Sequence, residues 1–513
     1  MLLNLVLFLP LAGFLLLLLL PRHSTGTIKN ACLAITLIVF LVSLGLIGTV
    51  RENPTVMSFV TDRPWIDTPQ IRYHIGLDGL SLWLVILSTL LTPIAVLVSW
   101  KYITNRVKEF FAFLLLLEFG LIGVFIALDL FLFYVFWEVC LVPMYFLIGI
   151  WGHDRRIYAA VKFFLYTMAG SVLMLAAIIY LYNKGGTFDY PVLLEMLRSG
   201  RLALSSTEQF YLFLAFFFAF AIKVPLFPFH TWLPDAHGEA PTAGSVMLAS
   251  VMLKMGTYGL VRFCLPMFPG AARQNADWII ALAIIGIIYG ALVALVQPNI
   301  KRLVAYSSVS HLGFVVLGIF SFNQLALDGA VYQMLNHGIS TGALFMLVGY
   351  LYERRHSLEI SDFGGVATRA PKLAAVFLLT TLASIGLPLL NNFIGEFLVL
   401  QGAAQVNFTW AIFAAIGVIL SACYMLWMYQ RTFLGEPSEE VAHHMSDMDR
   451  REWAAILPLV VLMIWMGTLT QSFLPPISAS NAQTLEQTKT NVEFQVNANP
   501  SVLARVKELF DAR

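Results

Sequence analysis

The chain has 513 residues, of which 59% are hydrophobic and only 12% are charged. Soluble globular proteins have about 25% charged residues. Half that share, with apolar runs along the whole length, indicates an integral membrane protein and excludes a soluble globular one. The net charge of +1, with no block rich in Lys or Arg, indicates no nucleic-acid partner. The lipid bilayer is therefore the first partner that the sequence implies.

The N-terminal segment MLLNLVLFLPLAGFLLLLLLPRHS has no positively charged region before its apolar stretch, so we expect a retained first helix and not a signal peptide. Apolar stretches of about 18 to 25 residues predict fourteen transmembrane helices. Most connections are short, which predicts one all-α bundle. The expected spans are 2–20, 31–50, 79–100, 110–128, 130–151, 161–183, 209–232, 243–267, 277–297, 303–322, 329–352, 373–400, 407–431 and 452–474.

Two polar segments lie outside this pattern. One is a loop at 51–78, and the other is a tail at 476–513, in which SVLARVKELFDA (501–512) predicts a short amphipathic helix. The four cysteines are far apart inside apolar runs, a spacing that fits neither a disulfide framework nor an iron–sulfur or zinc site. We expect buried thiols and no metal site at Cys32, Cys140, Cys264 and Cys423.

Lys and Arg are unevenly distributed between the two sides of the predicted bundle. The loops after odd-numbered spans hold 16 of these residues, the opposite loops hold 7, and the tail holds 4. Cytoplasmic loops are enriched in Lys and Arg. We therefore expect the richer side to be cytoplasmic and both termini to lie on the non-cytoplasmic side.

Prolines interrupt two of the predicted spans. In FAIKVPLFPFHTWLPDAH (220–237), Lys223 is followed two residues later by Pro225 and five residues later by Pro228. Pro388 interrupts the twelfth span in SIGLPLLNNFIGEF. An interior proline removes a backbone donor and frees a carbonyl group, which protein or water must satisfy inside a membrane. Each break therefore predicts a small hydrated cavity at mid-membrane.

Two stretches, 160–182 and 330–352, align without gaps at an offset of 170 residues. They occupy spans six and eleven, and the proline breaks follow in spans seven and twelve. An odd number of spans per repeat inverts the second copy relative to the first, as in many transporters. We expect an N-terminal three-helix segment at 1–100, a first repeat at 110–267, an inverted second repeat at 277–431, and a last helix with a polar tail at 452–513.

Ionisable side chains inside the spans carry the functional information, because a charge at the bilayer centre costs about 2.5–3.5 kcal/mol on insertion scales. Burial lowers the pKa of a lysine and a nearby carboxylate raises it again. A lysine whose distance from a carboxylate changes can therefore bind and release a proton. These residues favour a proton-transfer path, although structural ion pairing, or ordinary core hydrogen bonding for the histidines, stays open. They are Glu138 in span five, Lys223 in span seven, Lys254 in span eight, His311 in span ten, His337 in span eleven and Glu396 after the break in span twelve.

Other charged residues in or near the spans have weaker functional indications. Glu118 in span four either modulates a buried pair or faces a polar neighbour. His230 and His237 flank the loop after span seven, where ordinary loop hydrogen bonds are favoured over control of proton uptake. Structural roles, including snorkelling of a long side chain to the interface, are expected for Asp129, Lys162 and Arg262.

Three motifs carry a resemblance to a known family: YVFWEVCLVPMYFLIGIWG, AIKVPLFPFHTWLPDAHGEAPTAGSVMLASVMLKMGTYGLVR and KRLVAYSSVSHLGF. They closely resemble the antiporter-like membrane subunits of respiratory complex I, NADH:quinone oxidoreductase, and the match extends over nearly the whole chain. The sequence is most similar to the M-type subunits, the counterparts of mitochondrial chain 4. Glu396 stands in the second broken helix, where L- and N-type subunits typically have Lys, and no long lateral helix of the L-type is expected.

The resemblance implies fourteen helices, two inverted five-helix repeats, and proton translocation coupled to quinone reduction elsewhere in the complex. It implies no cofactor or redox centre in this chain, with NADH, FMN, iron–sulfur clusters and quinone in partner subunits. L- and N-type neighbours and a bacterial inner (plasma) membrane are implied as well. The family's proton-transfer residues correspond to Glu138, Lys223, Lys254, His311, His337 and Glu396.

Three other functions remain open from the sequence. Multi-subunit sodium/proton antiporters and membrane-bound hydrogenases use homologous subunits. A stand-alone secondary transporter would need a solute pocket with convergent polar groups, whereas the broken spans offer mainly proton-relay residues. A purely structural subunit would leave the buried charges unexplained.

Overall fold

Apolar helices make up most of the structure, a computed structural model that describes residues 1–437 and 439–498. Twelve helices in this described part are long and apolar enough to cross a membrane, and each overlaps one of the predicted spans. They are α1 (Leu2–Leu19), α2 (Thr25–Leu44) with α3 (Ile47–Glu52), α4 (Gly79–Tyr102), α5 (Val107–Ile126), α6 (Leu130–Trp151), α7 (Arg156–Gly185), the segment Thr242–Met267, α15 (Ala276–Leu295), α16 (Ile300–Phe320), α17 (Gln324–Arg355), α21 (Phe408–Phe433) and α23 (Arg450–Thr468).

The other two predicted spans are interrupted where the prolines stand. Span seven is divided into α9 (Ser206–Lys223) and α10 (Trp232–Glu239). Span twelve is divided into α19 (Pro371–Ser384) and α20 (Asn391–Val406). Both predicted breaks are therefore present, while the total of fourteen membrane crossings stays a prediction.

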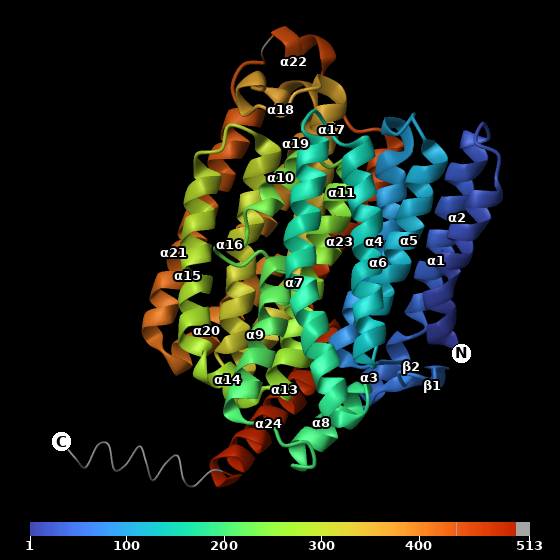
Figure 1. The fold of residues 1–513 in the computed structure, drawn as a ribbon. Coiled ribbons are helices and arrows are strands. Elements are labelled where there is room, and N and C mark those ends of the chain that lie inside the picture. Colours follow the sequence, from blue (N-terminus) through green and yellow to red (C-terminus); the bar gives the residue numbers. More distant parts are fainter. Residues whose placement is uncertain (438, 499–513) are drawn as a thin grey trace.

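The two ends of the bundle differ in what covers them (Figure 1). We call the end that holds Met1 the N-terminal face. A β-hairpin, α8 and α24 also lie there, and α18 and α22 lie at the opposite face. The bounds of these elements are β1 (Ser58–Ile66), β2 (Ile71–Leu77), α8 (Tyr190–Arg198), α18 (Val366–Arg369), α22 (Glu439–His444) and α24 (Leu474–Ala498).

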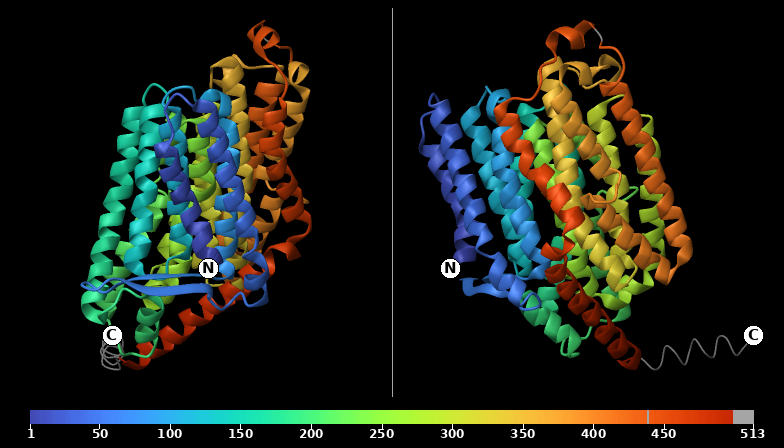
Figure 2. Two further views of the ribbon diagram at one scale, coloured as in Figure 1. Left: turned by 90° about the vertical axis from the view of Figure 1, so that its right-hand side faces the viewer. Right: turned by 180° about the vertical axis from the view of Figure 1, so that it is seen from behind.

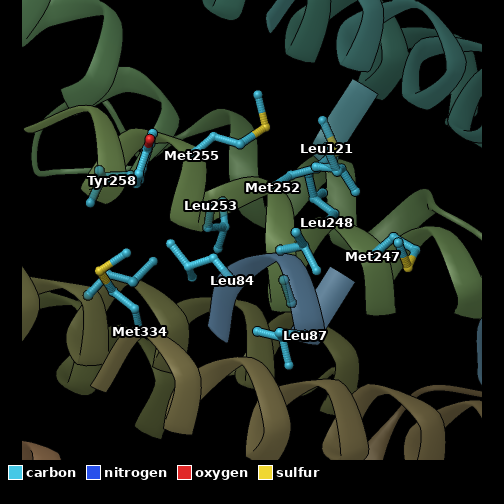
Figure 3. Packing of buried hydrophobic residues seen from close by; sticks show 14 of the residues in the cluster. Leu84, Leu87, Leu121, Met247, Leu248, Met252, Leu253, Met255, Tyr258 and Met334 are labelled. Carbon is cyan, nitrogen blue, oxygen red and sulfur yellow. The ribbon is translucent and has the colours of Figure 1, made fainter. Parts of the chain in front are cut away.

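The centre of the bundle is enclosed by its own helices. The segment Thr242–Met267 and α17 are buried over their apolar length, whereas α1 and α2 bury no more than about a third of theirs. Figure 3 shows Leu84 and Leu87 of α4 packed between Leu253 and Met334, which come from the enclosed segment and from α17. Polar side chains on the enclosed helices must therefore find their partners within the protein.

Backbone hydrogen bonds at the two ends of the bundle repeat at an offset of 170 residues. The first set joins Leu130 to Phe188 and Tyr190 to Leu128, and the second joins Ile300 to Leu358 and Ile360 to Pro298. Asp129 and Asn299 cap α6 and α16 in the same way, each accepting two backbone N–H groups. The first set lies beside α8 and the second on the side of α18, at opposite ends (Figure 1). This pattern supports the inverted repeats, which stay a prediction.

The segment expected as a loop at 51–78 contains an antiparallel hairpin, β1–β2, which extends across the N-terminal face (Figure 2). The missed signal is the alternation of Ile71, Tyr73, Ile75 and Leu77 along β2. His74 of the same strand anchors the hairpin to the bundle, with its Nδ1 atom 2.6 Å from Asp189 Oδ2 at the start of α8.

The polar tail is also more ordered than the sequence predicts. Residues Leu474–Ala498 form α24, a helix of 25 residues that runs obliquely across the N-terminal face (Figure 2). Ser478 and Asn481 of this helix donate hydrogen bonds of 2.6 and 2.9 Å to Asp328 of α17. The amphipathic helix predicted at 501–512 lies outside the described residues.

The burial of each cysteine matches that of the helix that carries it. Cys32, Cys140 and Cys264 are buried free thiols, as predicted. The prediction is wrong for Cys423, which is exposed, because α21 lies at the periphery of the bundle and turns this residue outward.

The hairpin attachment predicts a pH-dependent contact. Burial lowers the pKa of His74, but the hydrogen bond and charge of Asp189 outweigh burial and hold that pKa above its ordinary value. The protonated histidine therefore stabilises the docked hairpin below the unfolded pKa of about 6.5, and this contribution is lost as pH rises through the higher folded pKa. We expect hydrogen-exchange protection of the hairpin amides, corrected for intrinsic rates, to fall over that range. In the His74→Gln variant we expect the protection to be lower than in the wild type at acidic pH and nearly constant with pH. A variant profile identical to that of the wild type would contradict the assignment.

Candidate functional site

The first break places Lys223 at the C-terminal end of α9 and not midway along a continuous helix, as the sequence suggested. The carbonyl groups at this helix end are satisfied within the protein. Val224 N donates to Phe220 O at 2.8 Å, Leu226 N to Ala221 O at 2.9 Å, and the Trp232 indole N–H to Ile222 O at 2.9 Å. The helix dipole is negative at this end and favours an ammonium group there.

Lys223 is buried among aromatic rings. Its side chain is 1% exposed, and Nζ lies 5.5 Å from the ring centroid of Trp137 and 5.2 Å from that of Phe163. Glu138 follows Trp137 on α6. Among the described residues, however, Glu138 and Lys223 form no ion pair within 4.0 Å. Glu138 Oε1 is likewise buried without a hydrogen-bond partner in this described part of the chain.

Lys254 is held by an irregular helix. The segment Thr242–Met267 consists of α11 (Thr242–Met247), a π-helical turn at Leu248–Met252, α12 (Leu253–Gly259), a second π-helical turn at Leu260–Cys264, and α13 (Leu265–Met267). Lys254 Nζ donates to Ala249 O, five residues earlier, at 2.6 Å, and lies 2.7 Å from His337 Nδ1. Such π-turns inside α-helices are frequent at functional sites.

The hydrogen-bond chemistry of this contact fixes the histidine tautomer. A lysine ammonium only donates, so His337 Nδ1 accepts from a charged Lys254 and the ring proton is on Nε2. His337 Nε2 is buried and has no hydrogen-bond partner among the residues described.

His311 and Glu396 form the second tight contact. His311 Nδ1 lies 2.7 Å from Glu396 Oε1, which also accepts a hydrogen bond of 3.0 Å from Gln333 Nε2. The Tyr424 hydroxyl is 3.5 Å from His311 Nε2. The ring centroids of His311 and His337 are 6.0 Å apart, so the two tight contacts lie next to each other.

The second break positions Glu396. Ile385 N donates to Thr381 O and Leu387 N to Leu382 O, both at 3.0 Å, as at the first break. Gly386 has a left-handed φ of +77°, and a Cβ atom added to it would lie 3.4 Å from Glu396 Oε2. The carboxylate therefore lies against the broken backbone. The amide of Asn392 donates to Ser384 O at 3.4 Å, so a side chain satisfies the end of α19.

The structure thus brings four of the six predicted site residues into one buried line, namely Lys254, His337, His311 and Glu396. Lys223 and Glu138 lie outside this line. The helices of the two lysines nevertheless pack closely, since a Cβ atom at Gly256 would stand 2.7 Å from Phe220 O. Only glycine permits this approach of α12 to α9.

Amide side chains beside Glu396 were missed by the sequence analysis. Gln333 binds the carboxylate, Asn336 Nδ2 donates to Gln333 Oε1 at 3.4 Å, and Asn391 Nδ2 donates to Asn336 O at 3.0 Å. The available signal was their position, because Gln333 precedes His337 by one helical turn and Asn391 follows the proline break.

The remaining charged residues have mixed outcomes. Glu118 is fully buried, and neither carboxylate oxygen has a hydrogen-bond partner within the described chain. Lys162 pairs with Asp235 at 2.7 Å, which fits a structural role. Arg262 pairs with Asp78 at 2.6 Å, which fits the structural role expected for it.

The two loop histidines also differ from expectation. His237 stacks on Phe345 with ring centroids 4.4 Å apart, and both of its ring nitrogens lack hydrogen-bond partners among the described residues. The expected loop hydrogen bonds are therefore wrong for His237. His230 stacks on Phe227, and its Nδ1 is likewise unpartnered in the part of the chain that the structure describes.

Comparisons with known proteins place this chain in a family. A family model described as NADH:quinone oxidoreductase/Mrp antiporter, TM matches residues 127–421, which include all six predicted site residues. The chain is 48% identical over 478 residues to NADH-quinone oxidoreductase subunit M of Rhodobacter capsulatus, a match that covers 91% of this chain and 93% of the relative. The chain belongs to this family.

Two further similarities extend over the same range. NADH-ubiquinone oxidoreductase chain 4 of Chondrus crispus is 42% identical, with 93% of this chain and 96% of the relative covered. A chain in the structure of respiratory complex I from Thermus thermophilus with bound NADH superimposes with a TM-score of 0.86 at 34% identity, covering 95% of this chain and 100% of that chain. The complex I fold predicted from the motifs is therefore confirmed.

Gly386 gives a direct test of the second break. An L-residue in the left-handed region costs about 1–2 kcal/mol, and the added methyl group of Gly386→Ala would also press toward Glu396. We expect a lower thermal unfolding midpoint for this variant. Gly26→Ala is the matched control, because no atom lies within 4 Å of the added Cβ in α2 and alanine favours helix. Equal unfolding midpoints for wild type and Gly386→Ala would show that the break tolerates a side chain.

Proposed function

We propose that the chain is an M-type membrane subunit of NADH:quinone oxidoreductase that translocates protons through its buried Lys, His and Glu side chains. The observation that carries this proposal is the line Lys254–His337–His311–Glu396, in which each end contact is 2.7 Å long. Buried ionisable groups in membrane helices are costly and mark proton or ion pathways. Structural ion pairing alone does not account for a line that joins four helices through two histidines.

In the proposed path a proton arrives from the opposite face and binds Lys223. Glu138 sets the proton affinity of Lys223 through its charge, which a change in their separation would alter. The proton then passes by way of Lys254 to His337. A bridging water would connect the two imidazole rings, since 6.0 Å between centroids exceeds a direct hydrogen bond. His311 delivers the proton to Glu396.

The assembly around the chain follows from this proposal. Quinone reduction and the NADH, FMN and iron–sulfur chemistry would take place in partner subunits, with no redox centre in this chain. L- and N-type subunits would flank it within a bacterial inner membrane. The Lys- and Arg-rich opposite face would be cytoplasmic, so that Met1 and α24 would lie on the non-cytoplasmic side. The segments 110–267 and 277–431 would be the two inverted repeats.

A sodium/proton antiporter or a membrane-bound hydrogenase would use a related subunit. The 48% identity to a subunit M favours complex I over both. Purification of the native assembly separates these functions: NADH-oxidising and iron–sulfur subunits should accompany this chain. Recovery with antiporter partners alone would refute the proposal.

The apolar groove on the surface of the bundle does not offer the solute site that a stand-alone transporter would need. A large groove of about 800 Å³ among the described residues lies between α2, α4 and α23, and side chains such as Phe40, Ile94 and Leu457 make its lining almost wholly apolar. Solute sites need convergent polar groups, which this groove does not supply.

Removal of the charge of Lys223 or of Glu138, at the start of the path, should sharply reduce proton pumping. For Lys223→Met and Glu138→Gln we expect proton uptake into NADH-energised membrane vesicles to fall by at least roughly tenfold, equivalent to a barrier about 1.4 kcal/mol higher. Lys184→Met and Glu195→Gln are matched controls, because both side chains are exposed and belong to surface ion pairs. Full pumping in both Lys223→Met and Glu138→Gln would refute the mechanism.

A further inference from the structure

The helix that carries Lys254 continues toward the N-terminal face with two more polar side chains, Tyr258 and Arg262, at intervals of four residues. Arg262 Nε donates to the Tyr258 hydroxyl at 3.1 Å, and Ser81 of α4 donates to the same hydroxyl at 3.3 Å. The Tyr258 hydroxyl in turn donates to Phe125 O at 3.1 Å. Tyr258, Ser81 and Arg262 therefore form a ladder of polar groups, which begins one helical turn after Lys254 and leads toward the N-terminal face.

The outer end of this ladder is charged and borders water-accessible space. Arg262 Nη2 donates to Asp78 Oδ1 at 2.6 Å and to Ser81 Oγ at 3.2 Å. A hollow of about 230 Å³ between α8, α24 and the helix of Arg262 is lined by Asp78, Arg262, Glu195 and Arg198. Arg262 is 8% exposed and Tyr258 only 1%, so the guanidinium is the boundary between the hollow and the buried helix.

Neither Arg262 nor Tyr258 is arranged to carry a proton onward. A guanidinium remains charged and has no acceptor site. The single proton of the Tyr258 hydroxyl points to the Phe125 carbonyl, and both neighbouring groups donate to that hydroxyl. A fixed arginine charge in a narrow passage excludes protons and other cations.

We propose that Arg262 blocks proton movement between Lys254 and the compartment at the N-terminal face. This inference rests on the proposed function. It explains why a proton on Lys254 leaves sideways through His337 and not along its own helix. Without the block, protons from that compartment would return to Lys254 without passing Glu396. Asp78 is a positioning residue, because its carboxylate and Ser81 hold the guanidinium across the ladder.

The experiment measures passive proton flow through the assembled complex. The purified complex is reconstituted into liposomes, a potassium diffusion potential is imposed without NADH, and an internal pH dye records proton entry. We expect Arg262→Gln to raise this flow roughly tenfold, as removal of about 1.4 kcal/mol of barrier does. Arg262→Lys, which keeps the charge, should remain near the wild-type value. Arg273→Gln is the matched control, since Arg273 also lies at the N-terminal face but outside the ladder.

A double variant distinguishes the effect of removing the Arg262 charge from the effect of leaving the Asp78 carboxylate unpaired. Asp78→Asn with Arg262→Gln removes both charges, and it also provides a measurement if Arg262→Gln alone does not assemble. Raised flow in the double variant, with wild-type flow in Arg262→Lys, supports the proposal. Wild-type flow in the double variant overturns the proposal, even where the single variant Arg262→Gln raises the flow, because that increase would then come from the unpaired Asp78.

Failure of this proposal can be distinguished from failure of the proposed function. If Arg262 is not the block, passive flow is unchanged while Lys223→Met still abolishes NADH-driven pumping. If the proposed function is wrong, Lys223→Met pumps normally whatever the Arg262 variants do.

Discussion

The structure depends on one constraint: inside a membrane every backbone polar group must find a partner within the protein or its bound water. Each broken helix frees such groups, and each break is closed by a side chain from the following segment. The Trp232 indole satisfies Ile222 at the first break, and the Asn392 amide approaches Ser384 at the second. Breaks of this kind fix where polar side chains can be tolerated, and Glu396 lies at one of them.

The same constraint explains why the buried line lies at the centre of the bundle. Lys254 donates to the Ala249 carbonyl in the π-turn and also contacts His337, so two groups of the protein satisfy its ammonium. Such an arrangement is stable only on enclosed helices, because lipid offers no partner to an ammonium group. The close approach at Gly256 keeps the helix of Lys254 against α9 and thereby brings the two lysine helices together.

The sequence predicted those features that depend on local chemistry. Apolar length predicted the spans, and Pro225 and Pro388 predicted the breaks because proline has no N–H group. The contact of His311 with Glu396 joins residues 85 positions apart, and the Arg262–Asp78 pair joins residues 184 apart. No local pattern encodes such pairs. Helix α24 was missed for a related reason, since it is a polar segment that is held by contacts with the bundle such as those to Asp328. The hairpin is different, because the alternation of apolar residues along β2 was a local signal that the analysis passed over.

The tautomers of the two histidines limit how often the proposed path can carry a proton. In the proposed path His337 accepts a proton from Lys254 at Nδ1 and releases the proton on Nε2, which a bridging water would pass on to His311 Nε2. His311 then releases its own Nδ1 proton to Glu396, 2.7 Å away. Each ring then has its proton on the other nitrogen. Neither ring can pass a second proton in the same direction until it resets, that is, until its original tautomer is restored. Because Tyr424 is only 3.5 Å from His311 Nε2, its hydroxyl can occupy that nitrogen in the reset ring. The proposed path would therefore move one proton per reset and would not conduct continuously.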